Sequence, residues 1–273
     1  IYLKVGDKTI PLSGKWKYKV SASNSDFDFV EYGPNAYPSL LYNAMVNPLV
    51  GLSMQGVIWY QGENNTNRAK EYYHLFPAMI NDWRKKWGKD FPFYWVQLAN
   101  YMDVVEVPSE SLWAQVREAQ TQTLSLSHTG QAVIIDIGEA KDIHPKNKQE
   151  VGRRLALHAL HNDYGFSDVV CESPMPKTVR RVQDKIVVQF DNVADGLIVK
   201  NKYGYLMSFA VAGNDGVYKW VQAKVAGKDR VVLSCPDVID PVSVRYAWGD
   251  NPDDANLYNS VGLPATPFEI KIE

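Results

Sequence analysis

The residues best suited to acid–base chemistry are Asp142 and His144, which stand one residue apart in the segment Asp-Ile-His-Pro. A nearby carboxylate can hold an imidazole in one tautomer, so that its other nitrogen acts as a general base. The same residue types also occur in ordinary loops, and Asp142 could instead cap the helix that follows. The pair is therefore a candidate base with its orienting acid, and the loop interpretation stays open beside it.

A second candidate group is the run Gln61, Gly62, Glu63 and Asn64. A carboxamide beside a glycine can donate hydrogen bonds to a developing oxyanion, which acyl transfer has to stabilise. The alternative is a polar turn whose groups satisfy one another. Both interpretations remain open at the level of the sequence.

Other residues that could do chemistry carry weaker signals. His158 and His161 lie three positions apart on a predicted helix, but no carboxylate or cysteine at matching spacing completes a metal site. We expect them to be surface or partly buried histidines. Cys171 and Cys235 match no metal spacing, and one disulfide or two free thiols are both compatible with the sequence.

The elements that position these groups follow from the pattern of apolar residues. From Ser39 to Gly165, short apolar runs alternate with amphipathic stretches, which is typical of a parallel sheet covered by helices. Strands are predicted at 56–60, 93–98 and 132–136, and helices at 72–87, 112–123 and 148–164. Pro77 is expected to kink the first helix or mark its start, and the inward residues are expected to include Trp83, Trp87, Leu112 and Trp113.

Polar residues follow each predicted strand, where the crevice of an open parallel sheet usually binds its ligand. We therefore expect these side chains to converge on one site. They are Gln61 to Asn65 after the first strand, Gln97 and Asn100 after the second, and Asp136, Glu139, Asp142 and His144 after the third.

The pattern changes beyond Pro174 to short β-branched and aromatic runs separated by turn residues, which predicts a small antiparallel β-sandwich-like domain. The expected organisation is a β-like segment and loop over 1–34, a part of an insertion; an incomplete α/β domain over 35–170; and a β domain over 171–273. The early loop includes a Ser/Asn/Asp cluster at 21–28.

The composition of the chain argues against two classes of binding partner, nucleic acids and membranes. The 273 residues carry a formal net charge of −2, so no basic surplus attracts nucleic acid or anionic lipid. No apolar run approaches the roughly 20 residues that cross a bilayer. The chain begins with apolar residues and no Met, which suggests a segment of a longer protein.

The block at 56–65, Gly-Val-Ile-Trp-Tyr-Gln-Gly-Glu-Asn-Asn, resembles the best-known block of the sialate O-acetylesterase family, a branch of the SGNH hydrolases. Further similar stretches occur in the same order over most of the chain, which makes the resemblance specific. They lie at 41–49, 91–99, 117–120, 142–157 and 244–265.

The resemblance implies hydrolysis of acetyl groups from sugar hydroxyls, typically those of sialic acid, by serine, histidine and aspartate without a metal or other cofactor. His144 would be the general base, Asp142 its orienting acid, and Gln61 part of the oxyanion hole, with Gly62, Glu63 and Asn64 beside it. One residue separates Asp142 from His144, where SGNH hydrolases more widely have two. The resemblance also implies a periplasmic or secreted protein.

The sequence departs from this family at the nucleophile. The family's serine lies in a Gly-Gln-Ser-Asn type block before a helix, and no such block occurs here. Ser13, Ser39 and Ser53 lack the strand-to-helix setting of a nucleophile. We expect the serine to lie upstream of this chain, and the missing part or a second copy to cover an open sheet edge.

Two other functions remain alternatives. One is a catalytically silent protein that binds acetylated glycans in the same crevice. The other is a metal-dependent hydrolase that uses Asp136, Glu139, Asp142, His144 and Glu63 as ligands.

Overall fold

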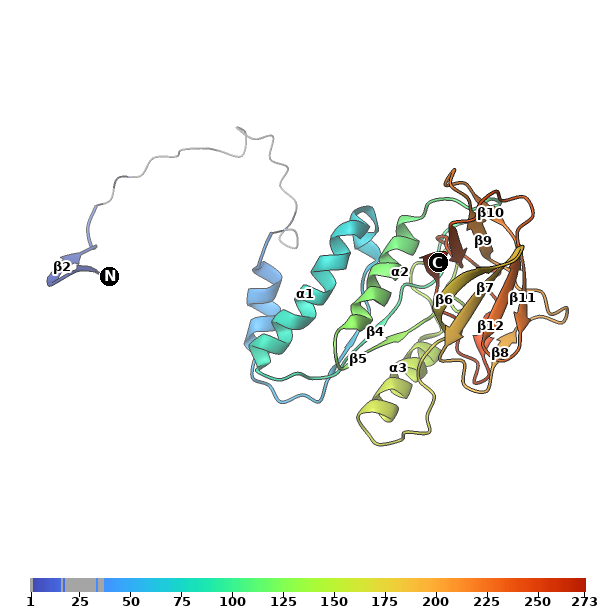
Figure 1. The fold of residues 1–273 in the computed structure, drawn as a ribbon. Coiled ribbons are helices and arrows are strands. Elements are labelled where there is room, and N and C mark those ends of the chain that lie inside the picture. Colours follow the sequence, from blue (N-terminus) through green and yellow to red (C-terminus); the bar gives the residue numbers. More distant parts are fainter. Residues whose placement is uncertain (1, 16, 18–32, 34–36) are drawn as a thin grey trace. The chain divides into compact units, whose positions relative to one another are not determined.

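The computed structural model describes residues 2–15, 17, 33 and 37–273, which form two compact units, Ile1–Leu52 and Ser53–Glu273 (Figure 1). In the first unit, β1 (Tyr2–Val5) and β2 (Lys8–Pro11) form an antiparallel hairpin. Two short helical turns, Tyr42–Val46 and Asn47–Leu49, follow later in this unit. The predicted Ser/Asn/Asp loop at 21–28 lies outside the described residues.

The second unit begins with a parallel sheet of three strands, β3 (Val57–Trp59), β4 (Phe93–Val96) and β5 (Thr129–Ala132), paired in that order. The central strand β4 is buried along its whole length, as expected for a parallel strand that is covered on both faces. Strand β3 lies at one edge of this sheet, and its Ile58 side chain is 71% exposed. The predicted α/β architecture is confirmed.

Helices cover both faces of this sheet. Successive side chains of β4 point to opposite faces, so they pack in two different cores. Phe93 and Trp95 pack in one core with α1 (Ala69–Trp87) and α2 (Leu112–Gln122). Tyr94 and Val96 pack in another core with α3 (Lys148–Asn162). The helices thus fix the loops that follow the strands, where the candidate site residues stand.

Three details differ from the sequence prediction. Helix α1 starts at Ala69 and continues through Pro77, because a continuous apolar face offsets the hydrogen bond that proline cannot donate. The third strand ends at Ala132: residues 133–135 are buried by packing but are not paired in the sheet. Leu112 is 53% exposed rather than inward, since it directly follows the capping residue Ser111, whose Oγ accepts from the Ala114 backbone N–H.

The residues beyond 174 form antiparallel sheets, as the sequence predicts. Two four-stranded sheets contribute to one hydrophobic core, and β14 (Leu257–Asn259) pairs separately with β8 (Leu197–Val199). One larger sheet has the order β10 (Tyr218–Trp220), β9 (Phe209–Ala212), β13 (Ser243–Tyr246) and β15 (Phe268–Lys271), and the other has the order β11 (Gln222–Ala226), β12 (Arg230–Ser234), β7 (Lys185–Asp191) and β6 (Met175–Val182).

The antiparallel part is joined to the α/β part by buried hydrogen bonds. The Arg117 guanidinium on α2 donates to the backbone carbonyls of Leu98 and Ala99, and also to those of Gly249 and Asp250. Burial lowers the pKa of this group to about 9, while the Asp250 charge opposes that shift, so Arg117 stays charged at neutral pH. The loop after β13 is therefore held against the loop after β4.

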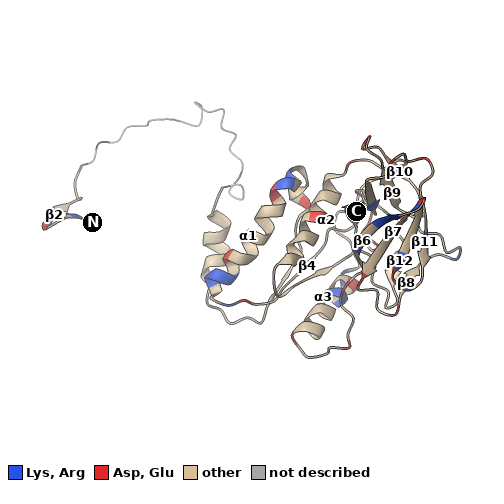
Figure 2. Cartoon of the chain, viewed as in Figure 1, with Lys and Arg blue, Asp and Glu red and all other residues tan. Residues whose placement is uncertain are grey.

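The charges of the chain are balanced in sign, and its two cysteines are not joined by a disulfide. Lys and Arg, and Asp and Glu, are scattered over the helices and strands (Figure 2), and the sequence has 29 of the former and 31 of the latter, so neither sign predominates. Cys171 and Cys235 are buried free thiols, so the second of the two sequence alternatives is correct. Among the described residues, no helix is both long and apolar enough to cross a membrane.

Candidate functional site

A cavity of 360 Å³ lies beyond the carboxyl end of strand β3. One side is formed by residues that follow this strand and the other by the loop before α3. Its lining residues are Tyr60, Gln61, Glu63 and Asn64 on the first side, and Ile143, His144 and Lys148 on the second. The structure thus brings Gln61, Glu63, Asn64 and His144 to one hollow, as expected from their positions after the strands.

Asp142 and His144 are close within this loop. The Asp142 Oδ1 atom lies 3.6 Å from His144 Nδ1 and accepts a hydrogen bond of 2.9 Å from the His144 backbone N–H. The His144 side chain is 85% exposed. Because the carboxylate faces Nδ1, Nε2 is the nitrogen left to accept a proton from another group. Asp142 does not cap α3: that position is taken by Asn147, whose Oδ1 accepts from the Glu150 backbone N–H.

The base of the His144 loop is anchored by hydrogen bonds from distant parts of the chain. Gly138 N–H donates to Asn100 Oδ1 at 2.7 Å, and Asn100 Nδ2 donates to Asn251 Oδ1 at 2.8 Å. A side chain at Gly138 would clash with the Asn100 carbonyl, so this close approach requires glycine. Glu139 and Lys146 close the loop with a 3.0 Å ion pair. The site loop is therefore positioned by both β4 and the antiparallel part.

The Gln61 carboxamide is held from two sides. Its Nε2 donates to Asn65 Oδ1 at 2.7 Å, and its Oε1 accepts from the Tyr72 hydroxyl at 3.1 Å. Polar groups of this turn thus hydrogen-bond to one another in part, as the polar-turn alternative predicted. One of the two N–H bonds of Gln61 Nε2, however, has no partner among the described residues. That bond is a donor available to a ligand.

Gly62 continues this turn with φ of 150°, a conformation that residues with side chains rarely adopt. A Cβ here would approach Gln120 Nε2 and Leu98 Cδ2 to 3.2 Å each. Gly62 therefore sets the backbone that directs Gln61 on one side and Glu63 on the other, rather than lining the hollow itself.

Tyr60 and Lys148 line the hollow but were not assigned roles from the sequence. The Lys148 Nζ atom lies 4.7 Å from the centroid of the Tyr60 ring. Burial, and secondarily the Glu63 charge, raises the pKa of Tyr60 to about 12, so its hydroxyl stays protonated at neutral pH. The available signals were the position of Tyr60 directly after the strand and of Lys148 at the first turn of the helix.

Other predicted site residues lie elsewhere. Gln97 is buried under α2 and donates to the Arg117 carbonyl and the Thr121 hydroxyl. Asp136 forms a bidentate ion pair with Arg154, with 2.6 Å between Nη1 and Oδ1 and 2.9 Å between Nη2 and Oδ2. These contacts tie the layers of the fold together, so the prediction that the polar residues after the strands converge was wrong for these two. Asn100 and Glu139 do not line the hollow either.

The metal-ligand set suggested by the sequence is not assembled. Asp136 is paired with Arg154 and Glu139 with Lys146. Within the described ranges, no group of three or more His, Cys, Asp and Glu side chains could hold a metal ion.

The two helical histidines have structural partners. The His158 ring is buried, stacks on Tyr94 with 5.5 Å between ring centroids, and contacts the Gln131 carbonyl. His161 contacts the Val169 carbonyl through Nδ1. The expectation of surface or partly buried histidines is confirmed for His161, which is partly buried, and was wrong for His158, which is buried. Trp113 is buried, and Trp83 and Trp87 pack against the same core.

No hydrogen bond joins a serine hydroxyl to His144 in the part of the chain from Ser53 to Glu273. Ser111, for example, caps α2 and donates to Asp250. The hollow therefore presents a histidine, a carboxylate and an amide donor, but this unit contributes no serine bonded to them.

Comparisons with known proteins give a consistent result. A family model described as carbohydrate esterase, sialic acid-specific acetylesterase, matches residues 25–161, half of the chain. Curated relatives named sialate O-acetylesterase include one from Pongo abelii, 31% identical over 86% of this chain and 49% of the relative. Another, from Rattus norvegicus, is 31% identical over 89% of this chain and 50% of the relative.

A solved structure of a carbohydrate acetylesterase from Xanthomonas citri is also similar, with 45% identity and a TM-score of 0.81. The match covers 86% of this chain and 55% of that one. The chain thus spans about half the length of the curated relatives that it matches.

Proposed function

This chain belongs to the sialic acid-specific acetylesterase family of carbohydrate esterases, and we propose on that premise that it carries the acid–base part of an O-acetylesterase acting on sugars. The observation that supports the proposal is the meeting of His144 and Gln61 at one hollow, with Asp142 beside the imidazole. A proton acceptor and an oxyanion donor on facing walls are what acyl transfer requires.

In the proposed reaction, His144 Nε2 takes the proton of a serine hydroxyl as its oxygen attacks the acetyl carbonyl carbon. The Gln61 N–H stabilises the resulting oxyanion, and His144 then donates the proton to the sugar oxygen as the ester bond breaks. Water, deprotonated by His144, attacks the acetyl-enzyme, and the serine oxygen leaves with the proton as acetate is released. Asp142 favours the protonated imidazole that forms in both steps.

The serine in this scheme is proposed to come from outside the Ser53–Glu273 unit, upstream in a longer protein. Two observations support this: the relatives are about twice as long as the matched region, and β3 is an edge strand with an exposed Ile58. A further strand from the same protein, or from a second copy, would satisfy the free backbone groups of that edge.

Replacing Gln61 by Glu tests the oxyanion role. The substitution keeps the size of the side chain but replaces the donor N–H bonds by an acceptor, so kcat for acetate release is expected to fall by about 10²–10³-fold. Initial rates on an aryl acetate, measured in the upstream-extended protein, provide the readout. The control is Gln122→Glu, a glutamine at the end of α2 that does not line the hollow. Full activity of Gln61→Glu would contradict the donor role.

We propose O-acetylated sialic acid, a sugar with a carboxylate, as the preferred substrate. The Lys148 ammonium lines the hollow and has no ion-pair partner among the described residues. An ammonium without a counter-charge can form a charge-assisted hydrogen bond with a substrate carboxylate. Glu63, in the same hollow, can accept hydrogen bonds from sugar hydroxyls.

The experiment is acetate release from O-acetylated sialic acid and from a neutral aryl acetate, by this chain alone and by the upstream-extended protein. We expect turnover only in the extended protein. Lys148→Met is expected to lower kcat/KM on the sialic acid ester about tenfold, the equivalent of one charged hydrogen bond, with the aryl acetate unaffected. Lys141→Met, a lysine of the same loop region outside the hollow, is the matched control. Equal losses on both esters would contradict the carboxylate assignment.

A second candidate function is a silent binding protein for acetylated glycans, favoured by the absence of a serine bonded to His144 within Ser53–Glu273. Binding of an acetylated sugar by the folded, extended protein without any acetate release would support this function and overturn the esterase proposal.

A further inference from the structure

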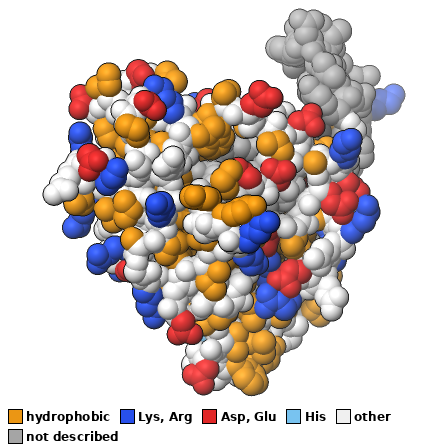
Figure 3. All heavy atoms as spheres, turned by 90° about the vertical axis from the view of Figure 1, so that its right-hand side faces the viewer, with side chains coloured by type: hydrophobic (Ala, Val, Ile, Leu, Met, Phe, Trp, Pro, Cys, Tyr) orange, Lys and Arg blue, Asp and Glu red, His pale blue; other side chains and the backbone are white. Residues whose placement is uncertain are grey.

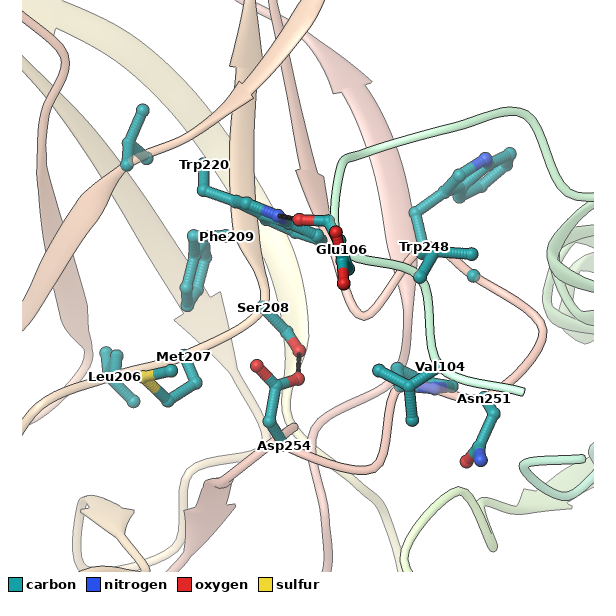
Figure 4. A pocket seen from close by; sticks show the side chains of 14 residues that line it. Val104, Glu106, Leu206, Met207, Ser208, Phe209, Trp220, Trp248, Asn251 and Asp254 are labelled. Atoms are coloured by element: carbon teal, nitrogen blue, oxygen red, sulfur yellow. Dashed lines mark hydrogen bonds between the residues drawn. The ribbon is translucent and has the colours of Figure 1, made fainter. Parts of the chain in front are cut away.

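A second cavity, of 290 Å³, lies between the loop after β4 and the antiparallel sheets (Figure 4). It shares no lining residue with the hollow at His144. Its volume is near the lower limit of about 300 Å³ for ligand pockets, which suits a single small ring rather than a long chain. The residues used below are Glu106 from the loop, and Ser208, Phe209, Trp220 and Asp254 from the antiparallel part.

One wall of this cavity is an aromatic ring with a fixed orientation. Trp220 on β10 is 43% exposed, and its Nε1 donates to the Glu106 carbonyl at 2.9 Å. This bond, drawn in Figure 4, joins two residues that line the cavity and restricts rotation of the indole. Phe209, which is buried, lies deeper on the neighbouring strand β9. A partly exposed ring whose N–H edge is anchored can serve as a platform for a flat apolar surface.

The acidic side chains of the cavity lining, Glu106 and Asp254, provide hydrogen-bond acceptors. Ser208 Oγ donates to Asp254 Oδ1, and the two side chains point toward each other in Figure 4. The other oxygen of the Asp254 carboxylate has no hydrogen bond or ion pair within the described part of the chain. It can therefore accept hydrogen bonds from a ligand.

The charges of the lining exclude an anionic ligand. Glu106 and Asp254 are carboxylates, and none of the lining residues is Lys, Arg or His. A phosphate or a carboxylate would meet like charge here without compensation. A neutral ligand with one apolar face and hydroxyl donors at its edge can use both the aromatic ring and the free acceptor.

The face of the molecule on the side of the antiparallel sheets does not show one continuous apolar area. Figure 3, which views the molecule from the side of the antiparallel sheets, shows hydrophobic side chains in small patches separated by Lys, Arg, Asp and Glu. A docking face would instead be a continuous apolar area. The apolar residues Val104, Val105 and Met207 line the cavity itself and are partly exposed there.

We propose that this cavity binds one neutral sugar ring, with the C–H face of the ring on Trp220 and a hydroxyl group donating to Asp254. The site is separate from the hollow that contains His144, and its ligand differs from the acidic sugar proposed there by having no charge. The inference does not depend on hydrolysis, because it rests on a different cavity.

The test is a titration of this chain with neutral mono- and oligosaccharides. Binding is monitored by NMR signals of the tryptophan indole N–H groups. We expect the Trp220 signal, assigned by its loss in Trp220→Phe, to shift with saturation. Trp220→Ala and Asp254→Ala are each expected to weaken binding at least about tenfold, since stacking or one hydrogen bond to a charged group is lost. Trp220→Phe, which keeps an aromatic ring, should retain part of the affinity and guards against a folding artefact.

Two controls separate this proposal from the esterase. Tyr203→Ala removes an exposed aromatic ring outside the cavity and should leave binding unchanged. His144→Ala should also bind neutral sugar normally, while Trp220→Ala should hydrolyse an aryl acetate normally in the extended protein. Absence of any saturable shift with neutral sugars, or undiminished binding by Trp220→Ala, would overturn the proposal whatever the outcome for acetate release.

Discussion

His144→Ala is expected to lower kcat for acetate release by about 10³–10⁴-fold in the upstream-extended protein, the usual loss when a nucleophile's general base is removed. The reason is that both proton transfers of the proposed reaction pass through this imidazole. The side chain is 85% exposed, so its removal should leave the unfolding transition unchanged. Initial rates on an aryl acetate and thermal unfolding of the same samples measure the two effects.

His128→Ala is the matched control for this experiment. His128 also lies beside an aspartate, with Nδ1 3.0 Å from Asp90 Oδ2, and it is largely exposed, but it is outside the hollow. It should retain full activity. A His144→Ala enzyme with near-normal turnover would remove His144 from the role of base, and equal losses in both variants would point to a non-specific effect.

Arg117→Leu is expected to reduce the free energy of unfolding by about 3–5 kcal/mol, as is typical when one partner of a buried charged network is removed. Arg117 is 0% exposed and donates to four backbone carbonyls, those of Leu98, Ala99, Gly249 and Asp250. Leucine leaves these buried acceptors without their donor. Urea unfolding followed by tryptophan fluorescence measures the change.

The control for Arg117 is Arg153→Leu on α3. Arg153 is about half exposed and, among the described residues, forms an ion pair only with Glu150, so the loss should be within about 0–1 kcal/mol. If Arg117→Leu also stayed within about 1 kcal/mol of the parent, the hydrogen bonds that join the two parts would contribute far less than argued here. The Arg117 effect should also lower activity indirectly, since the same loops anchor Asn100 and Asn251 below the His144 loop.

Much of the fold could be predicted from local pattern. The apolar runs around Ile58 and Trp95 and the one-sided helices after them predicted a parallel sheet covered by helices, because burial of one helix face or both strand faces leaves a periodic signature. The β-branched runs beyond Pro174 predicted antiparallel sheets for the same reason. The third strand was predicted at 132–136 but lies at Thr129–Ala132, because residues 133–135 are buried by packing, and hydrophobicity cannot separate packing from strand pairing.

For the candidate site, the sequence by itself determined which residue types were available: a histidine next to an aspartate, and a glutamine next to a glycine, each following a strand. Only the tertiary structure decided which of them share a hollow. Asp136 pairs with Arg154 rather than facing His144, and the His144 loop depends on an Asn100–Asn251 bond between residues 151 positions apart. Tyr60 and Lys148 meet at the hollow from different elements. Contacts between residues so distant in sequence are determined by how the layers of the fold pack, and the local spacing of residues in the sequence does not encode that packing.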